Sequence, residues 1–157
     1  MLMFKSVVKF FCGGIAIIGV GVGAIFLIDY IRYQKSPEYQ AQQEIEKIKK
    51  EIADDPYGGD TPEQTLRLFI DALKQGDTNL AAKYFVYDKQ EEWKMDLAKI
   101  EEKGLLDEMV KDLERVKYKY DISENTIGFD IANDQKEAIL SITITLTPNN
   151  KWKIKDL

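Results

Sequence analysis

The pattern of hydrophobic and polar positions begins with a long apolar run near the N-terminus. No charged residue occurs from Phe10 to Ile28. As a helix, this run would be ~28 Å long, close to the ~30 Å hydrocarbon thickness of a bilayer. It predicts a segment 1–35 made of a short tail and a single transmembrane helix, with a span of about residues 7–28. The alternative is a cleaved signal peptide, whose apolar region is normally shorter and ends at a small-residue cleavage site that this chain lacks.

A stripe of small residues runs along the predicted span. Cys12, Ala16, Gly19 and Gly23 recur at spacings of four, three and four, which places them on one face of a helix. Small residues let two membrane helices approach closely, so the stripe predicts a homodimer through the membrane helix. The alternative is that Gly is common in membrane helices in general.

The segment 36–60 is predicted to be a connector. Pro37 should separate the membrane helix from the rest of the chain, and residues 38–53 then show apolar positions at helical spacing. Two heptads form a marginal helix in isolation, so this stripe should either pack on the body or pair with a second copy. The run 54–60 is rich in Asp, Gly and Pro. It predicts a solvated spacer and lacks the ligand spacing of an EF-hand calcium loop.

The body, residues 61–157, opens with four predicted helices. Thr61 is the expected N-cap of the first, with Pro62 at its first position and Gly76 just beyond its end. Asp77 and Asp88 are the expected caps of the second and third helices. The third should end at Gly104, and a fourth apolar-periodic stretch comes after it.

The period then changes to two residues, which is the signal of strands. The positions expected to face the core are Val116, Tyr118, Tyr120, Ile122, Ile127, Phe129, Ile131, Ala138, Leu140, Ile142, Ile144, Leu146, Trp152 and Ile154. Four short-linked strands predict an antiparallel sheet with one apolar face that the helices cover, so the fold class is α+β. Lysines recur on the first and last strands, where they would discourage edge-to-edge pairing.

Two stretches of the body resemble a known superfamily. The opening TPEQTLRLFIDALKQGDTNLAAKYF and the closing NKWKIKDL resemble the nuclear transport factor 2-like superfamily, and most of all its uncharacterised bacterial members anchored in membranes or made as lipoproteins. The resemblance implies a cone in which a curved sheet wraps on helices around a pocket. Enzymes of the superfamily use pocket Asp, Tyr or His, and no pattern here allows those roles to be transferred.

Composition narrows the chemistry. The chain has 157 residues, no His and a single Cys, which excludes His-dependent nucleophiles, His-ligated zinc and disulfides within the chain. No catalytic residue, metal ligand or cofactor is predicted. Residues 1–35 hold four Lys or Arg and one Asp, whereas residues 36–157 hold 18 Lys or Arg and 26 Asp or Glu. An acidic body is a poor match for nucleic acid.

These observations favour a non-catalytic binding or assembly domain of the cell envelope. The lipid bilayer and an unidentified envelope protein are the expected partners, with the N-terminus cytoplasmic and the C-terminal domain extracytoplasmic. The alternatives are a small-pocket enzyme using a carboxylate and Tyr, or an inner-membrane assembly component similar to that of type IV secretion systems. Asp130, the one acid of the central strands, should face away from any pocket. The aromatic residues that could line a pocket, or else belong to the core, are Tyr84, Trp93, Tyr118, Tyr120, Phe129 and Trp152.

Overall fold

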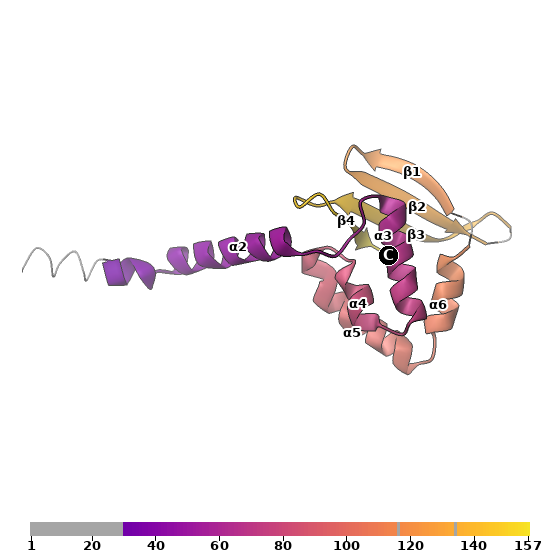
Figure 1. Ribbon diagram of the computed structural model, residues 1–157, viewed down its shortest axis with the longest axis horizontal. Helices are drawn as coiled ribbons and strands as arrows, with labels where there is room; N and C mark the ends of the chain where they lie inside the picture. Colours follow the sequence, from indigo (N-terminus) through magenta and orange to yellow (C-terminus); the bar gives the residue numbers. More distant parts are fainter. Residues whose placement is uncertain (1–29, 116, 134) are drawn as a thin grey trace, which may run out of the picture. The chain divides into compact units, whose positions relative to one another are not determined.

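The computed structural model describes residues 30–115, 117–133 and 135–157 (Figure 1). The chain consists of two compact units, with the division after Lys50. Helix α2 (Pro37–Asp54) begins at the predicted break, where the Ser36 hydroxyl accepts a hydrogen bond from the Tyr39 amide at 3.2 Å. No residue of α2 is buried. Its last turn, from Glu51, belongs to the second unit.

The second unit contains α3 (Pro62–Lys74), α4 (Thr78–Lys83), the short 3-10 helix η1 (Tyr87–Lys89), α5 (Gln90–Glu102) and α6 (Leu106–Leu113). Two predicted caps are confirmed, because Thr61 Oγ1 accepts from the Gln64 amide at 3.2 Å and Asp77 Oδ1 accepts from the Leu80 amide at 2.8 Å. The predicted cap at Asp88 is wrong. Asp88 lies inside η1, and the first turn of α5 has no side-chain cap.

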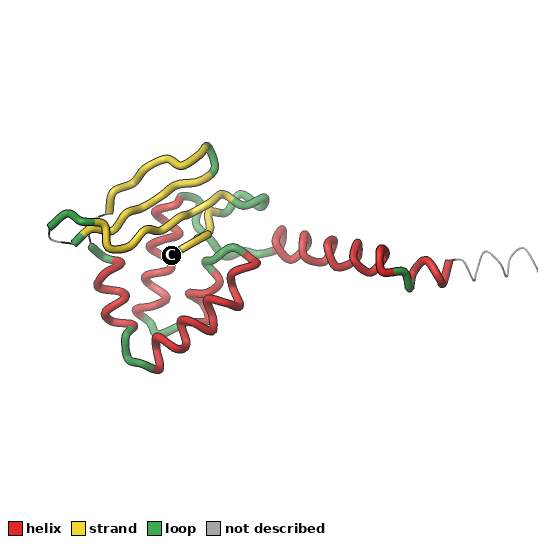
Figure 2. Tube along the Cα trace, turned by 180° about the vertical axis from the view of Figure 1, so that it is seen from behind, coloured by secondary structure: helices red, strands yellow, loops and turns green. Residues whose placement is uncertain are grey.

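The predicted antiparallel sheet is confirmed. Its strands β1 (Lys117–Ser123), β2 (Thr126–Ala132), β3 (Ala138–Leu146) and β4 (Trp152–Asp156) pair in sequence order. Helices α3 to α6 lie on one side of the sheet (Figure 2). The unit is therefore an α+β structure with helices packed on a four-stranded sheet.

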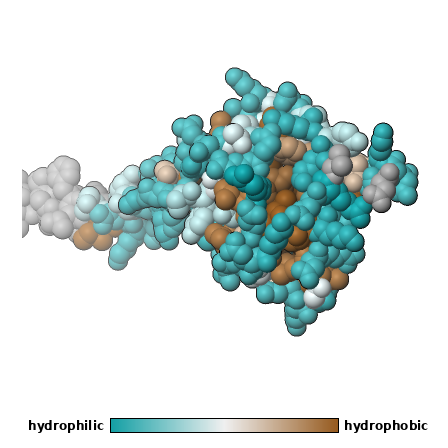
Figure 3. Space-filling model, turned by 45° about the vertical axis from the view of Figure 1, so that its right-hand side comes forward, coloured by the Kyte–Doolittle hydropathy of each residue, from teal (hydrophilic) through white to brown (hydrophobic). Residues whose placement is uncertain are grey.

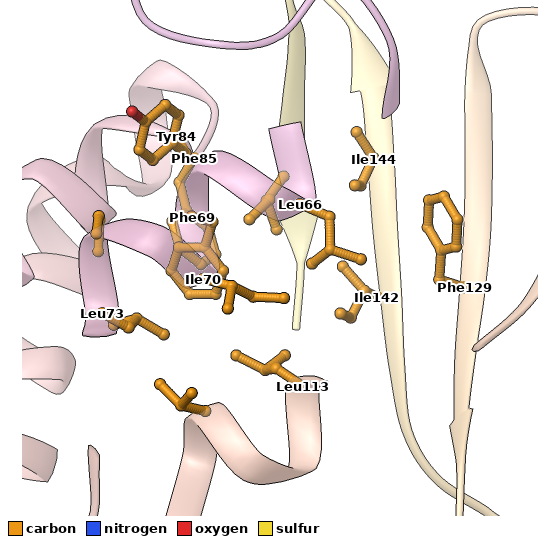
Figure 4. Close-up of a cluster of buried hydrophobic side chains, with 14 of the residues drawn as sticks. Leu66, Phe69, Ile70, Leu73, Tyr84, Phe85, Leu113, Phe129, Ile142 and Ile144 are labelled. Atoms are coloured by element: carbon orange, nitrogen blue, oxygen red, sulfur yellow. The ribbon is translucent and has the colours of Figure 1, made fainter. Parts of the chain in front are cut away.

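The core lies between α3 and the central strands. Leu66 and Ile70 of α3 lie toward Ile142 of β3 (Figure 4), and Phe69 and Ile144 belong to the same cluster. Phe69, Ile142 and Ile144 have no exposed surface. Burial of such side chains contributes ~1.5–3 kcal/mol each, so this interface contributes several kcal/mol to the stability of the unit.

Strand β1 does not follow the expected alternation. The register places Lys119 opposite Phe129, a core residue, so Lys117, Lys119 and Asp121 share the face toward the helices. The residues expected in the core, Tyr118, Tyr120 and Ile122, lie on the outer face and are 48%, 42% and 51% exposed. The prediction for β1 is therefore wrong in phase, while Ile127, Phe129 and Ile131 of β2 are buried as expected.

The segment 54–60 is not the solvated spacer that its composition predicted. Gly59 forms an antiparallel bridge with Trp152, and the Trp152 amide donates to the Gly59 carbonyl at 2.9 Å. The Tyr57 ring meets the Tyr84 ring edge-on, with ring centroids 6.4 Å apart. The outer edge of β4 is thus paired at Trp152 with the residues that precede α3.

The predicted span of residues 7–28 lies outside the described residues. Among the helices of residues 30–115, 117–133 and 135–157, none has the length and apolar character needed to cross a bilayer.

Candidate binding groove

An open apolar groove of about 360 Å³ lies where α5, α6, the start of β3 and the C-terminus meet. Its lining residues are Trp93, Ile100, Leu105, Glu108, Met109, Asp112, Leu140 and Leu157. Pockets for small ligands span ~300–1,000 Å³, so this groove is at the small end of that range. Figure 3 shows a strip of hydrophobic side chains at the surface of the molecule, bordered by hydrophilic residues.

Part of the groove is formed by the two ends of the apolar stripe of α5. Trp93, Leu97 and Ile100 lie on one face of α5, and only Leu97 at the centre is fully buried. Gly104, with φ of 70°, ends the helix in a left-handed turn that favours glycine. Helix α6 begins at Leu106, so Leu105 lies just before it. The Leu105 side chain is 43% exposed. Trp93 and Ile100 are therefore left half-buried along the groove.

Aromatic contacts hold the indole of Trp93 in position. It stacks on Phe85, with ring centroids 4.4 Å apart and planes 17° apart. Phe85 in turn meets Phe69 edge-on at 5.4 Å, and both of these rings are completely buried. Because the indole rests on fixed rings, the floor of the groove is formed before any ligand arrives.

Two carboxylates are the charged groups of the groove. Asp112 Oδ1 accepts from Arg115 Nε at 3.0 Å. Glu108 is exposed, and no residue of the described part of the chain forms an ion pair with it. The groove therefore presents apolar side chains with one unneutralised negative charge at its rim. This arrangement suits the burial of an apolar group that carries a cation nearby.

The lining offers little for bond-making chemistry. Apart from the two carboxylates, it contains no hydroxyl, thiol or amine side chain that could act as a nucleophile. Among the described residues, no three His, Cys, Asp or Glu side chains gather in a way that could hold a metal ion.

The six aromatic residues expected at a pocket lie in three different environments. Trp93 lines the groove. Tyr84 and Phe129 belong to the buried core, and Trp152 packs against that core half-buried. The other two, on β1, lie on the outer face of the sheet. The structure thus brings only Trp93 of this set to the groove.

Four further groove residues were expected in the core. Ile100, Leu105, Met109 and Leu140 have the apolar spacing of core positions, and spacing alone does not show which helix end is left uncovered. The signal that could have pointed to a groove is Leu105, an apolar residue directly after the helix-ending Gly104. The predicted stripe of Cys12, Ala16, Gly19 and Gly23 lies outside the described residues.

Asp130 lies on the outer face of the sheet, as predicted. Its Oδ1 accepts from Ser141 Oγ at 2.7 Å and from Tyr120 Oη at 3.3 Å. The Tyr120 ring covers Gly128, where an added Cβ would lie 2.3 Å from ring atom Cζ. Burial against this surface and the nearby charge of Asp130 raise the pKa of Tyr120. The pair sits on an open sheet surface and not in a pocket.

A buried ion pair lies on the opposite edge of the sheet. The side chain of Lys153 is 3% exposed, and its Nζ donates to Asp55 Oδ2 at 2.5 Å and to the Lys83 carbonyl at 2.9 Å. Gln90 Nε2 donates to the same carboxylate oxygen at 3.1 Å. The alternation of β4 predicted an exposed Lys153, and that expectation is wrong.

Burial lowers the pKa of Lys153, and Asp55 opposes this effect by favouring the charged ammonium. A lysine with a lowered pKa can act as a base or nucleophile when a substrate reaches it. Here the ammonium is covered and its hydrogen bonds are directed to Asp55 and a backbone carbonyl. The pair therefore holds the segment before α3 against β4 and leaves no room for a substrate.

No protein-family model, curated protein or solved structure matches this chain.

Proposed function

We propose that the chain is a membrane-tethered, extracytoplasmic and non-catalytic binding domain of the cell envelope, with a nuclear transport factor 2-like cone as its body. The apolar groove between α5 and α6 is where it binds. Its ligand is an apolar group next to a positive charge, such as an amphipathic amine or a basic-apolar segment of an envelope protein. The observation that carries this proposal is a preformed apolar floor with an unneutralised carboxylate at the rim.

The outer face of the sheet supports the non-catalytic part of the proposal. The enzyme alternative needs a carboxylate and a Tyr inside a pocket, where burial would tune them. Asp130 and Tyr120 are the carboxylate and Tyr that meet on the sheet, and they do so on the face away from the helices. Water reaches both groups, so neither gains the water-excluded surroundings that such catalysis uses.

The groove can be tested with two probes of the same shape and opposite charge. We expect 4-phenylbutylamine to bind the full chain saturably, with a dissociation constant at least tenfold below that of 4-phenylbutyrate. Fluorescence of Trp93, measured in a Trp152→Phe background, reports occupancy, because Trp93 lines the groove.

A matched pair of variants tests the carboxylate. Glu108→Gln should raise the dissociation constant of the amine about fivefold, equivalent to the ~1 kcal/mol expected for a partly exposed charge. Asp107→Asn, on the neighbouring residue that does not line the groove, should leave it unchanged. Equal affinity for the two probes, or turnover of a small molecule that one carboxylate change abolishes, would refute the proposal.

The membrane tether has its own test. The intact mass of protein purified from membranes should include residues 1–35. A soluble form that starts between Gly23 and Ser36 would instead make the protein secreted.

A further inference from the structure

The two edge strands of the sheet, β4 and β1, differ in whether their outer backbone groups are paired. On the outer edge of β4, the Ile154 amide donates to the Tyr84 carbonyl and the Val86 amide donates to the Ile154 carbonyl, both at 2.9 Å, in addition to the bond to Gly59. On the outer edge of β1, no segment of the described chain pairs with the strand, and β1 lies at the border of the sheet in Figure 1. Within the described chain, β1 is unpaired along its whole outer edge, and β3 is unpaired on its β4 side from Ala138 to Ile142.

The lysines of β1 do not protect this edge as the sequence suggested. Lys119 Nζ donates to Glu63 Oε1 at 2.7 Å, and Lys117 Nζ donates to the Arg115 carbonyl at 3.2 Å. Both side chains are thus directed to the helix side of the sheet. The other face of the strand presents the exposed Tyr118, Tyr120 and Ile122 described above. An edge with apolar exposed side chains and unpaired backbone groups is a template for strand addition.

We propose that β1 pairs antiparallel with β1 of a second copy of this chain, in a register centred on Tyr120. In this register Lys119 stands opposite Asp121 of the second copy on the helix side of the sheet. Tyr118 stands opposite Ile122 of the second copy on the outer face. From Tyr118 to Ile122, before the register shift that ends at Ser123, the strand is thus complementary to itself in both charge and hydrophobicity, which is the condition for a twofold-symmetric interface.

The neighbouring registers lack this complementarity. A register centred on Lys119 would place Lys119 opposite itself, and one centred on Asp121 would place two aspartates together, and like charges directly opposite each other are destabilising. A register displaced by one residue would join the outer face of one sheet to the helix side of the other. The centre at Tyr120 yields one eight-stranded sheet with all helices on the same side.

Disulfide crosslinking of the full chain tests the register. In a Cys12→Ser background, Tyr120→Cys places the new cysteine opposite itself, within the Cα separation that a disulfide spans. We expect it to form a crosslinked dimer at least tenfold faster than Tyr118→Cys. Chains carrying Tyr118→Cys should crosslink readily only when mixed with chains carrying Ile122→Cys. Equal rates for Tyr120→Cys and Tyr118→Cys would overturn the register, and the absence of crosslinking in all of them would overturn the interface.

Charge reversal tests the complementarity. Asp121→Lys, added to the Tyr120→Cys chain, should slow crosslinking at least tenfold because it opposes Lys119 with a lysine. Mixing this chain with one that carries Lys119→Asp should restore the rate, since every opposing pair is then of opposite charge. Glu63→Gln accompanies Lys119→Asp, so that the new aspartate does not face Glu63.

A control separates edge pairing from packing through the face of the sheet. Ile139 is 46% exposed on the outer face of β3, two strands away from the edge. Ile139→Glu should leave crosslinking of Tyr120→Cys unchanged. If Ile139→Glu slows it as strongly as Asp121→Lys does, the copies meet through their sheet faces and the proposal is wrong.

Discussion

Removing the carboxylate that neutralises Lys153 should destabilise the body of this protein. The change is Asp55→Asn, which keeps the size of the side chain and one acceptor oxygen. Leaving one member of a buried ion pair without its partner costs about 3–5 kcal/mol in general. The ammonium keeps the Lys83 carbonyl at 2.9 Å, and the new amide can still accept a hydrogen bond. We therefore expect a loss of ~3 kcal/mol in the free energy of unfolding at pH 7.

The loss should depend on pH with a defined sign. The pKa of Lys153 is already lowered in the folded state by burial, and Asp55 is the group that raises it. Without Asp55 that pKa falls further below 10.5, so the unfolded chain binds more protons than the folded one over a wider range. The stability of Asp55→Asn should therefore rise more steeply than that of the wild type as pH increases from neutral toward 10.5. The difference between the two proteins should shrink in the same direction.

Urea unfolding of the full chain, followed by near-ultraviolet circular dichroism, measures these differences. Asp54→Asn is the matched control, because Asp54 is exposed at the end of α2 and should change the stability by less than ~0.5 kcal/mol. Replacing both partners, in Asp55→Asn with Lys153→Met, should recover most of the loss because no charge remains buried.

The reasoning fails under two results. One is a loss below ~1 kcal/mol for Asp55→Asn, which would mean that Lys153 is solvated in solution. The other is a loss that grows as pH rises from neutral toward 10.5, because deprotonation of Lys153 should relieve the penalty and not increase it.

Three further changes test the fold. Gly128→Ala should cost ~1–2 kcal/mol in urea unfolding because its Cβ would overlap the Tyr120 ring, and an equal cost in a Tyr120→Ala background would contradict this contact. Ile142→Asp should abolish folding, since Ile142 has no exposed surface, and a native near-ultraviolet spectrum would show that the side chain does not face the core. Thr61→Ala should cost ~1 kcal/mol through loss of the cap on α3, whereas Thr61→Ser should behave like the wild type.

Much of the fold can be predicted from local signals in the sequence. The caps at Thr61 and Asp77 and the alternation of β2 and β3 are enough to indicate the α+β arrangement, because each depends on residues close together in the chain. The one misplaced cap, at Asp88, fell inside a 3-10 turn. A single residue's cap preference does not show which kind of helix comes after it.

The phase of β1 could not be read from its own residues. Tyr and Lys alternate along the strand, and both have an apolar stem with a polar end, so either set fits a half-buried face. The choice depends on distant partners. Lys119 forms an ion pair with Glu63 of α3, and the Tyr120 ring packs on the backbone of Gly128 in β2. These contacts exist only after the strands have paired.

The candidate site was hidden for a similar reason. Hydrophobic spacing identifies Ile100 and Met109 as inward-facing, but it does not show that α5 and α6 diverge enough to leave a groove between them. The role of Asp55 was hidden because a carboxylate in a run of Asp, Gly and Pro has the composition of a solvated turn. Its structural role comes from the ion pair with the buried ammonium of Lys153, which lies far along the chain.

The docking of Gly59 and Asp55 onto β4 also has a mechanical consequence. If the seven residues 55–61 between α2 and α3 were free, they would add ~25 Å of reach to the body. With those residues held to the sheet, this slack is absent, and a pull on the chain before Glu51 is transmitted to the last strand. The hydrogen bonds from the Asn149 side-chain amide to the Ile52 and Asp55 carbonyls and the Asp55–Lys153 pair would be loaded first, ahead of the core between α3 and β3. The body can thus respond to tension at its N-terminal end by releasing one sheet edge while its hydrophobic interior stays closed.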